Sequence, residues 1–310
     1  MMCVGGKMIW EREGKTWPHR DCSRFVTVGG FHWHVQSMGP TAGGNGKGGD
    51  APLLLLVHGT AATTHSWRDL MGPLARSFRV VAIDLPGHGF TRAPFSFRPT
   101  LPSMAKALSA LLAAEGLSPD GVVGHSAGAA ILARMVLDGS VTPRMLVSIN
   151  GAFMPFPGMA GTLFPYMARV LFCNPLTPYM MSWGAADQQR VERLIRDTGS
   201  LLDKPGMTYY GRLMRSPAHV SSALSMMAHW DLAPLNRDMR RLTIPLHLIV
   251  GEEDKAVSPD EAKRLATRVA TATLHVVPGG GHLVHEEQPD LVVGLIEQAA
   301  REVALLPPLS

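Results

Sequence analysis

Apolar residues along this chain follow two different patterns. In residues 23–30 and 31–39 apolar and polar side chains alternate, and the two stretches meet at Gly29-Gly30. This is typical of two antiparallel strands joined by a tight turn. From residue 51 onward, short runs that are apolar throughout alternate with segments of helical period. Such runs indicate parallel strands covered by helices on both faces. The pattern predicts an α/β fold with a mostly parallel central sheet that begins with an N-terminal antiparallel hairpin.

The second pattern is interrupted once. After Gly151, residues 154–232 hold nine of the 18 methionines and all four tyrosines, in helical pieces separated by prolines. We interpret this stretch as a helical cap inserted after the sixth strand, between the two parts of a core domain formed by residues 23–153 and 233–306. We expect strands within 51–59, 78–89, 121–126, 144–151, 244–254 and 273–282, and helices over 66–77, 100–115, 127–138, 259–270 and 288–306.

The amino-acid composition limits which partners and which cellular compartment we expect for this protein. The chain is 46% hydrophobic and 17% charged, and its formal net charge of +4 is spread without a dense basic run. This argues against nucleic-acid binding and is compatible with weak attraction to an acidic membrane surface. The longest apolar run, 53–57, is too short to span a bilayer, so we expect no transmembrane segment. The charged N-terminus is unlike a signal peptide, and Cys3, Cys22 and Cys173 are sparse enough to be reduced thiols, so we expect a cytoplasmic protein.

Two glycine-rich stretches are candidates for a functional site. Residues 41–50 precede a strand instead of opening a helix, so we interpret them as a loop and not as a phosphate-binding motif. In contrast, Gly124-His125-Ser126-Ala127-Gly128 joins an apolar strand to a helix. A serine on such a sharp turn is exposed at the end of the sheet, and the flanking small residues allow strand and helix to approach. Ser126 is therefore the candidate nucleophile; the alternative is a serine that only caps the helix.

A serine hydroxyl needs a base and a group that orients the base. Asp254 ends a predicted strand, and His282 follows the last strand in a glycine-rich turn. The neighbouring Glu252 and Glu253 compete with Asp254 for the role of the acid, although the Gly-x-x-Asp spacing favours Asp254. His282 and His285 could instead form a metal pair, but no metalloprotease-type framework accompanies them. We expect no metal ion and no cofactor.

The negative charge that develops in acyl transfer needs two backbone N–H donors. We expect these to be the amides of Ala127, directly after the nucleophile, and of Thr60, in the turn after the first parallel strand. His58 and Gly59 would shape this turn at the edge of the substrate pocket. Methionine and aromatic residues of the cap would line the pocket itself. The candidates are Phe164, Met180, Trp183, Met227 and Trp230, and His219 and His229 are less favoured candidates for binding a magnesium ion in a porphyrin.

These motifs resemble the α/β-hydrolase superfamily over roughly residues 23–306. Several stretches also resemble the BchO family, the magnesium-chelatase accessory proteins of bacteriochlorophyll biosynthesis. The resemblance is carried by WPHRDCSRFV (17–26), HGTAATTHSWRDL (58–70), DLPGHGFT (84–91), FPYMARVLFCNPLTP (164–178) and SPAHVSSALSMMAHWDLAPL (216–235). It implies an α/β-hydrolase fold, a role beside magnesium insertion into protoporphyrin IX in photosynthetic bacteria, chelatase subunits as partners, and a place at the periphery of the photosynthetic membrane. It implies no settled reaction.

Three functions remain open at this point. The protein could hydrolyse an ester or similar acyl bond of a tetrapyrrole or a lipid-like molecule. It could instead bind a porphyrin or assist the chelatase without catalysis, or it could be a general carboxylesterase unrelated to pigment, because a fold alone does not define a function.

Overall fold

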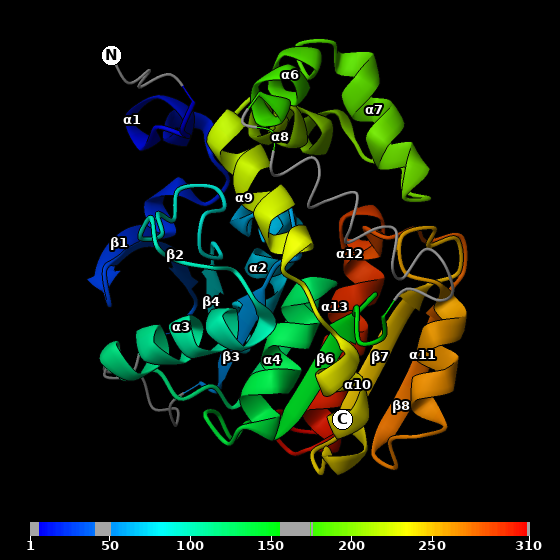
Figure 1. Ribbon diagram of the computed structural model, residues 1–310. Helices are drawn as coiled ribbons and strands as arrows, with labels where there is room; N and C mark the ends of the chain where they lie inside the picture. The colour runs from blue at the N-terminus through cyan, green and yellow to red at the C-terminus, as the bar shows by residue number, and fades with distance from the viewer. Residues whose placement is uncertain (1–5, 41–50, 156–173, 175, 309–310) are drawn as a thin grey trace.

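The computed structural model of this protein describes residues 6–40, 51–155, 174 and 176–308 (Figure 1). The glycine-rich stretch 41–50, Cys3, Phe164 and Cys173 lie outside the described residues, so the expectations for them stay predictions.

Eight strands of the described chain form one sheet in the order β1-β2-β4-β3-β5-β6-β7-β8. Strand β2 is antiparallel to both β1 and β4, and all other neighbours pair in parallel. This confirms the predicted sheet and its N-terminal hairpin, in which both Gly29 and Gly30 have the positive φ that a tight hairpin turn requires. The strands are β1 (Ser23–Val28), β2 (Phe31–Met38), β3 (Leu53–Val57), β4 (Arg79–Ile83), β5 (Gly121–His125), β6 (Met145–Ile149), β7 (Leu246–Gly251) and β8 (Ala272–Val277).

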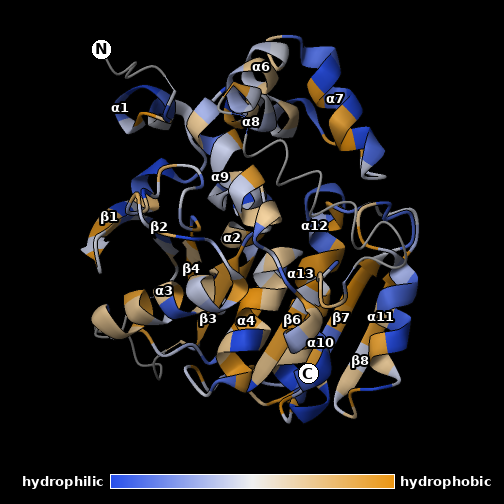
Figure 2. Cartoon of the chain, viewed as in Figure 1, coloured by the Kyte–Doolittle hydropathy of each residue, from blue (hydrophilic) through white to orange (hydrophobic). Residues whose placement is uncertain are grey.

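Helices cover both faces of the sheet, as the apolar strands predict. The helices of the core are α2 (Arg68–Leu74), α3 (Leu101–Ala114), α4 (Ala127–Leu137), α10 (Ala233–Asp238), α11 (Pro259–Ala266), α12 (Val284–Glu287) and α13 (Pro289–Glu302). Every residue of β3, β5, β6 and β7 is buried. One buried cluster contains residues of α3, α4, α10 and α11, and a second cluster contains residues of α2 and α13. The sheet is thus the middle of three layers, and its strands are the most hydrophobic part of the molecule (Figure 2).

Four helices between β6 and β7 form the described part of the cap, which confirms a helical insert after the sixth strand. They are α6 (Thr177–Gly184), α7 (Gln188–Asp197), α8 (Lys204–Met214) and α9 (Pro217–Ala228). The side chains of Asp187, Asp203 and Ser216 cap the N-termini of α7, α8 and α9, which satisfies backbone amides that helices otherwise leave unpaired. The cap lies beyond one end of the sheet (Figure 1).

The residues before β1 connect the cap to the core, which the sequence pattern did not predict. The carbonyl oxygen of Gly6 accepts hydrogen bonds from Ser216 Oγ at 2.6 Å and from the amide of Ala218 at 3.0 Å, at the start of α9. Farther on, Trp10 in the short helix α1 (Trp10–Glu13) and Trp17 both contact the ring of Phe90 edge-on. The N-terminal segment therefore lies against α9 and the loop after β4.

Helix α4 begins directly against the end of β3, and only glycine fits at this contact. A Cβ atom added to Gly128 would lie 2.1 Å from the carbonyl oxygen of Val57. On the strand side, a Cβ on Gly124 would lie 2.4 Å from the backbone nitrogen of Ala129. Both contacts are with backbone atoms, which cannot rotate away. The two glycines predicted to flank the nucleophile thus allow β5, α4 and β3 to meet.

Replacement of Gly128 by alanine should destabilise the fold. We expect Gly128→Ala to lower the free energy of unfolding by about 1–3 kcal/mol, because the added methyl group overlaps the backbone of β3. Urea unfolding followed by circular dichroism would measure it. Gly294→Ala is the matched control: Gly294 lies in the exposed face of α13 with no atom within 4 Å of the added Cβ, so this variant should gain about 0.5–1 kcal/mol. Equal stability of Gly128→Ala and the wild type would contradict the packing described here.

Candidate active site

Ser126 occupies a strained turn between β5 and α4. Its backbone has φ +50° and ψ −118°, a conformation that residues other than glycine rarely adopt. Neighbouring strands hold it there: its amide donates to the carbonyl oxygen of Ile149 at 3.0 Å, and its own carbonyl oxygen accepts from the amides of Ala129 and Ala152, each at 3.2 Å. The Ser126 hydroxyl makes no N-capping hydrogen bond with α4, so the capping alternative is wrong. The side chain is partly exposed.

The structure brings Asp254 and His282 together. Nδ1–H of His282 donates to Oδ2 of Asp254 at 2.8 Å, and in the neutral imidazole this tautomer makes Nε2 the acceptor. The other carboxylate oxygen of Asp254 accepts from the amides of Ala256 at 2.8 Å and Val257 at 2.9 Å, so the carboxylate is fixed in place. Asp254 is buried, whereas Glu252 and Glu253 are exposed. Of the three candidate acids, Asp254 is the one that contacts the imidazole.

Asn150 fixes the loop that carries His282, and the sequence analysis missed this residue. Its Nδ2 donates to the carbonyl oxygens of Gly281 at 2.9 Å and His282 at 2.8 Å, and its Oδ1 accepts from the amide of Gly251 at 2.9 Å. Asn150 has φ +46°, and asparagine tolerates this conformation better than most residues. The signal was present in the sequence, since an asparagine directly follows the buried strand β6 at the edge where the candidate residues meet.

The cap also positions the acid and the base. The carbonyl oxygen of Thr198, after α7, accepts from the amides of Lys255 at 3.1 Å and His282 at 3.3 Å. Two residues later, Ser200 Oγ accepts from the amide of Leu283 at 2.8 Å. The turn after α7 therefore holds both the Asp254 turn and the His282 loop, and a rearrangement of this part of the cap would change their geometry.

Ser126 and His282 lie at the same edge of the sheet without a direct bond. The ring of His125, next to Ser126, is 4.8 Å from the ring of His282, and its Nε2–H donates to the His282 carbonyl oxygen at 2.9 Å. Within the described part of the chain, no hydrogen bond joins the Ser126 hydroxyl to His282. Such a bond is often long in the absence of substrate and forms only in the complex.

The turn after β3 lies directly against Ser126. A Cβ added to Gly59 would be 2.9 Å from Cβ of Ser126, so only glycine allows this approach. The amides of Thr60 and Ala127 donate no hydrogen bond to any described residue, which leaves both available for an oxyanion. His58 is consistent with its predicted role in shaping this turn: it is fully buried, its Nε2 accepts from the amide of Leu85 at 2.9 Å, and burial lowers its pKa. It anchors the turn and does not face a substrate pocket.

Four of the five predicted pocket residues of the cap lie in the described chain, and their surroundings differ. Met180 and Trp183 are 67% and 85% exposed on α6, the helix drawn at the top of Figure 1, so their predicted place in the pocket is not supported. Met227 is partly buried, and Trp230 packs against the core cluster of α3 and α4. Helical periodicity alone did not show which face of each cap helix is turned inward. The methionine that contacts the oxyanion turn is the fully buried Met226, whose sulfur accepts from Thr60 Oγ1 at 3.5 Å.

The two buried histidines closest to the predicted metal roles, His219 and His285, are not arranged to bind a metal ion. His219 on α9 is buried; its Nδ1 accepts from the amide of Gly89 and its Nε2–H donates to the carbonyl oxygen of Ala61, each at 3.1 Å. Burial lowers the pKa of His219 to about 4, so the ring is neutral at pH 7. His285 is fully buried against Trp67 and His125, which does not support a metal pair with His282. No group of three or more His, Cys, Asp or Glu side chains in the described ranges could hold a metal ion.

The site combines a serine on a strained strand-to-helix turn with a histidine–carboxylate pair at the same edge of an eight-stranded sheet. This combination is characteristic of one class of proteins. The chain belongs to the alpha/beta hydrolase family, whose sequence model matches residues 54–295. It is similar over nearly its whole length to the magnesium-chelatase 30 kDa subunit of Rhodobacter capsulatus, with 39% identity over 280 residues that cover 90% of this chain and 95% of that protein. The predicted resemblance to the family of chelatase accessory proteins is thereby confirmed.

Solved structures confirm the fold. An alpha/beta hydrolase fold protein from Burkholderia ambifaria superposes with a TM-score of 0.74 and 22% identity, covering 90% of this chain and 98% of that chain. A thermophilic esterase from Thermogutta terrifontis gives a TM-score of 0.69 and 21% identity, covering 91% of this chain and 98% of that chain. In the part of the chain that the structure describes, no helix combines the length and the apolar character needed to cross a membrane.

The buried state of His219 predicts a loss of stability in mild acid. In the unfolded chain its pKa returns to about 6.5, whereas in the folded protein it is about 4. Between these values the unfolded state binds more protons, so the free energy of unfolding falls as the pH is lowered through this window. At about 1.4 kcal/mol for each pKa unit, His219 alone accounts for a loss of about 3 kcal/mol.

Urea unfolding across this pH range would test it with His219→Gln, whose amide can still donate to Ala61 but does not titrate. We expect this variant to be less stable than the wild type at neutral pH and to lose less stability on acidification. His32→Gln, at an exposed histidine of β2, should keep the wild-type pH dependence. If the free energy of unfolding fell equally with pH in His219→Gln and in the wild type, His219 would not be the cause of the loss of stability.

Proposed function

We propose that this protein is a serine hydrolase that cleaves an ester or a related acyl bond. Ser126 is the nucleophile, His282 is the general base and acid, and Asp254 orients His282. The observation that supports this most strongly is the 2.8 Å hydrogen bond between His282 Nδ1 and the buried carboxylate of Asp254, at the sheet edge where Ser126 occupies its strained turn.

In the proposed mechanism, Oγ of Ser126 attacks the carbonyl carbon of the substrate while Nε2 of His282 removes the hydroxyl proton. The amides of Thr60 and Ala127 then donate to the oxyanion, and each such donor is typically worth about 10²–10³ in rate. His282 returns the proton to the leaving alcohol as the carbon–oxygen bond breaks. His282 then deprotonates a water molecule, which attacks the acyl carbon. The bond from this carbon to Ser126 Oγ breaks, His282 returns the proton to Oγ, and the acid is released. Asp254 stabilises the imidazolium that forms in both steps.

We also propose that the reaction belongs to bacteriochlorophyll biosynthesis, beside magnesium insertion into protoporphyrin IX. The support is the 39% identity with the magnesium-chelatase 30 kDa subunit of Rhodobacter capsulatus, which extends through the cap as well as the core. On this proposal the substrate is a tetrapyrrole or a lipid-like ester, the partners are chelatase subunits, and the protein acts in the cytoplasm at the surface of the photosynthetic membrane. Residues 23–153 with 233–306 form the catalytic core, and residues 154–232 form the cap that selects the substrate.

A second candidate function is porphyrin binding in support of the chelatase, without hydrolysis. The observation that favours it is that the relative with 39% identity is named as a chelatase subunit. A general carboxylesterase unrelated to pigment is the third possibility, and the sequence relationship to a chelatase subunit argues against it.

Labelling with a fluorophosphonate ester tests the proposed nucleophile. We expect one adduct for each chain, on the peptide that contains Ser126, and none in Ser126→Ala, as measured by intact mass and peptide mapping. Asp254→Asn should slow labelling by about 10²–10⁴, because His282 would no longer hold the correct tautomer. Ser66 is an internal control: it is buried and its hydroxyl donates to the carbonyl oxygen of Thr63 at 3.0 Å. Labelling of Ser66 or Ser258 in place of Ser126 would exclude the mechanism.

A further inference from the structure

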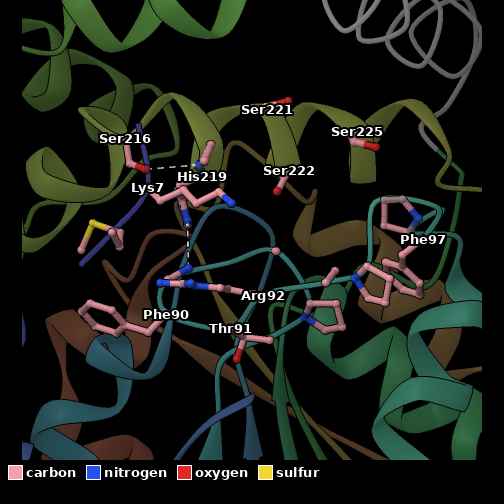
Figure 3. A pocket seen from close by; sticks show the side chains of 18 of the residues that line it. Lys7, Phe90, Thr91, Arg92, Phe97, Ser216, His219, Ser221, Ser222 and Ser225 are labelled. Carbon is pink, nitrogen blue, oxygen red and sulfur yellow. Dashed lines mark hydrogen bonds between the residues drawn. The ribbon is translucent and has the colours of Figure 1, made fainter. Parts of the chain in front are cut away.

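A cavity lies between α9 and the loop that follows β4, and none of the candidate catalytic residues lines it. Its volume is about 310 Å³, and its walls come from the N-terminal segment, residues 86–99 of the loop, and residues 216–225 of the cap (Figure 3). Pockets of this size hold small molecules or parts of larger ones. Neither the sequence motifs nor the proposed reaction accounts for this cavity.

The polar groups of this cavity are cationic or neutral. Lys7 and Arg92 line it, and no Asp or Glu does. Both side chains are exposed, and neither forms an ion pair with any carboxylate of the described chain. Arg92 projects across the cavity from the loop, and Lys7 extends beside His219 (Figure 3). Two unpaired cations without a nearby acidic residue favour an anionic ligand.

Hydroxyl groups of α9 add neutral hydrogen-bonding partners. Ser221, Ser222 and Ser225 line the same cavity, and Ser222 points from α9 toward the loop (Figure 3). On the loop side Gly87, with φ +79°, faces Ser222 so closely that an added Cβ would lie 2.6 Å from Ser222 Oγ. Serine hydroxyls donate to carboxylates or phosphates without adding charge.

The rest of the cavity wall is apolar. Phe90, Phe97 and several prolines of the loop line it, and Phe95 lies at its rim with its side chain fully exposed. Phe97 is held in place by packing against the core cluster and by an edge-on contact with Phe31 at 5.0 Å. An exposed phenylalanine beside unpaired cations fits a ligand that carries both an apolar surface and a negative charge.

We propose that this cavity binds the carboxylate-bearing edge of a flat apolar molecule, specifically the propionate edge of a tetrapyrrole. Arg92 and Lys7 pair with the carboxylate, the α9 serines donate to it, and Phe95 and Phe97 contact the ring. The carboxylate site is inferred from the cavity itself, while the choice of a tetrapyrrole over another apolar carboxylate rests on the proposed function. The cavity volume accommodates one edge of the macrocycle, and the remainder extends past Phe95 into solvent.

The cavity is close to the active site but separate from it. His219 forms part of the cavity wall, and its Nε2–H donates to the carbonyl oxygen of Ala61, directly after Thr60 in the oxyanion turn. The buried imidazole of His219 thus connects the cavity wall to the oxyanion turn. A tetrapyrrole held here would be anchored by its carboxylate next to the hydrolase site without occupying it.

Titration of the full-length protein with protoporphyrin IX tests the proposal, with binding followed by porphyrin fluorescence. We expect Kd to rise about tenfold or more in Arg92→Gln and further in the Lys7→Gln/Arg92→Gln double variant, because a hydrogen bond to a charged group is lost each time. The dimethyl ester of protoporphyrin IX has the same ring without the charges, so its binding should be unaffected by these substitutions. Arg98→Gln is the matched control, since Arg98 lies in the same loop and is exposed but does not line the cavity.

Two outcomes would overturn the proposal. Equal affinity of the double variant and the wild type for protoporphyrin IX would exclude the carboxylate site. Charge-dependent binding of laurate with no binding of protoporphyrin IX would exclude the tetrapyrrole and indicate a fatty acid. Hydrolysis of a small phenyl ester should be unchanged in Arg92→Gln, and binding should persist in Ser126→Ala. A failure of this proposal is therefore distinguishable from a failure of the proposed hydrolase activity.

Discussion

The strained turn at Ser126 is the constraint on which the rest of the site depends. A positive φ at a serine persists only where the surroundings enforce it, and here they do so from three sides. Ile149 and Ala152 bind its backbone, while Gly59 and Gly128 allow the turn after β3 to pack against it without a side chain between them. Thr60 directly follows Gly59 and Ala127 directly follows Ser126, which is why we propose their amides as the donors to the oxyanion. The strained backbone of Ser126 therefore lowers the stability of the fold, and it produces the local geometry that a nucleophile requires.

The cap helps to hold the candidate active site in place and does not only cover it. Besides the contacts of Thr198 with the acid and base turns, a buried polar cluster joins the cap to the core. Arg68 pairs with Glu286 of the core at 2.7 Å and with Asp203 of the cap at 2.8 Å, and the hydroxyl of Tyr210 donates to Glu286 at 2.8 Å. Burial raises the pKa of Glu286 to about 8 although Arg68 opposes this shift. Because the side chain of Glu286 is fully buried and that of Arg68 nearly so, these contacts hold the cap against the core.

Structural features that depend on local patterns of residues could be predicted from the sequence. Apolar runs predicted the parallel strands, Gly29-Gly30 predicted the hairpin, and the spacing around Ser126, Asp254 and His282 predicted which residues lie at one edge of the sheet. The side chains of Met180 and Trp183 could not be placed, because an amphipathic pattern does not show which partner a cap helix packs against. The position of Asn150 at the end of a predicted strand was visible in the sequence, but its contacts with Gly251, Gly281 and His282 were not. The cavity beside α9 was missed for a related reason, because its walls come from segments far apart in the chain.

On the proposed function, this protein acts through the chemistry of Ser126 and not through binding alone. The most direct measurement is complementation of a photosynthetic bacterium that lacks the protein, with bacteriochlorophyll and protoporphyrin IX quantified in the same cells. Our account predicts that the wild type restores bacteriochlorophyll, and that Ser126→Ala, present in equal amount and folded, leaves protoporphyrin IX accumulated. Full restoration of the pigment by Ser126→Ala would contradict the account and would favour a binding role without hydrolysis.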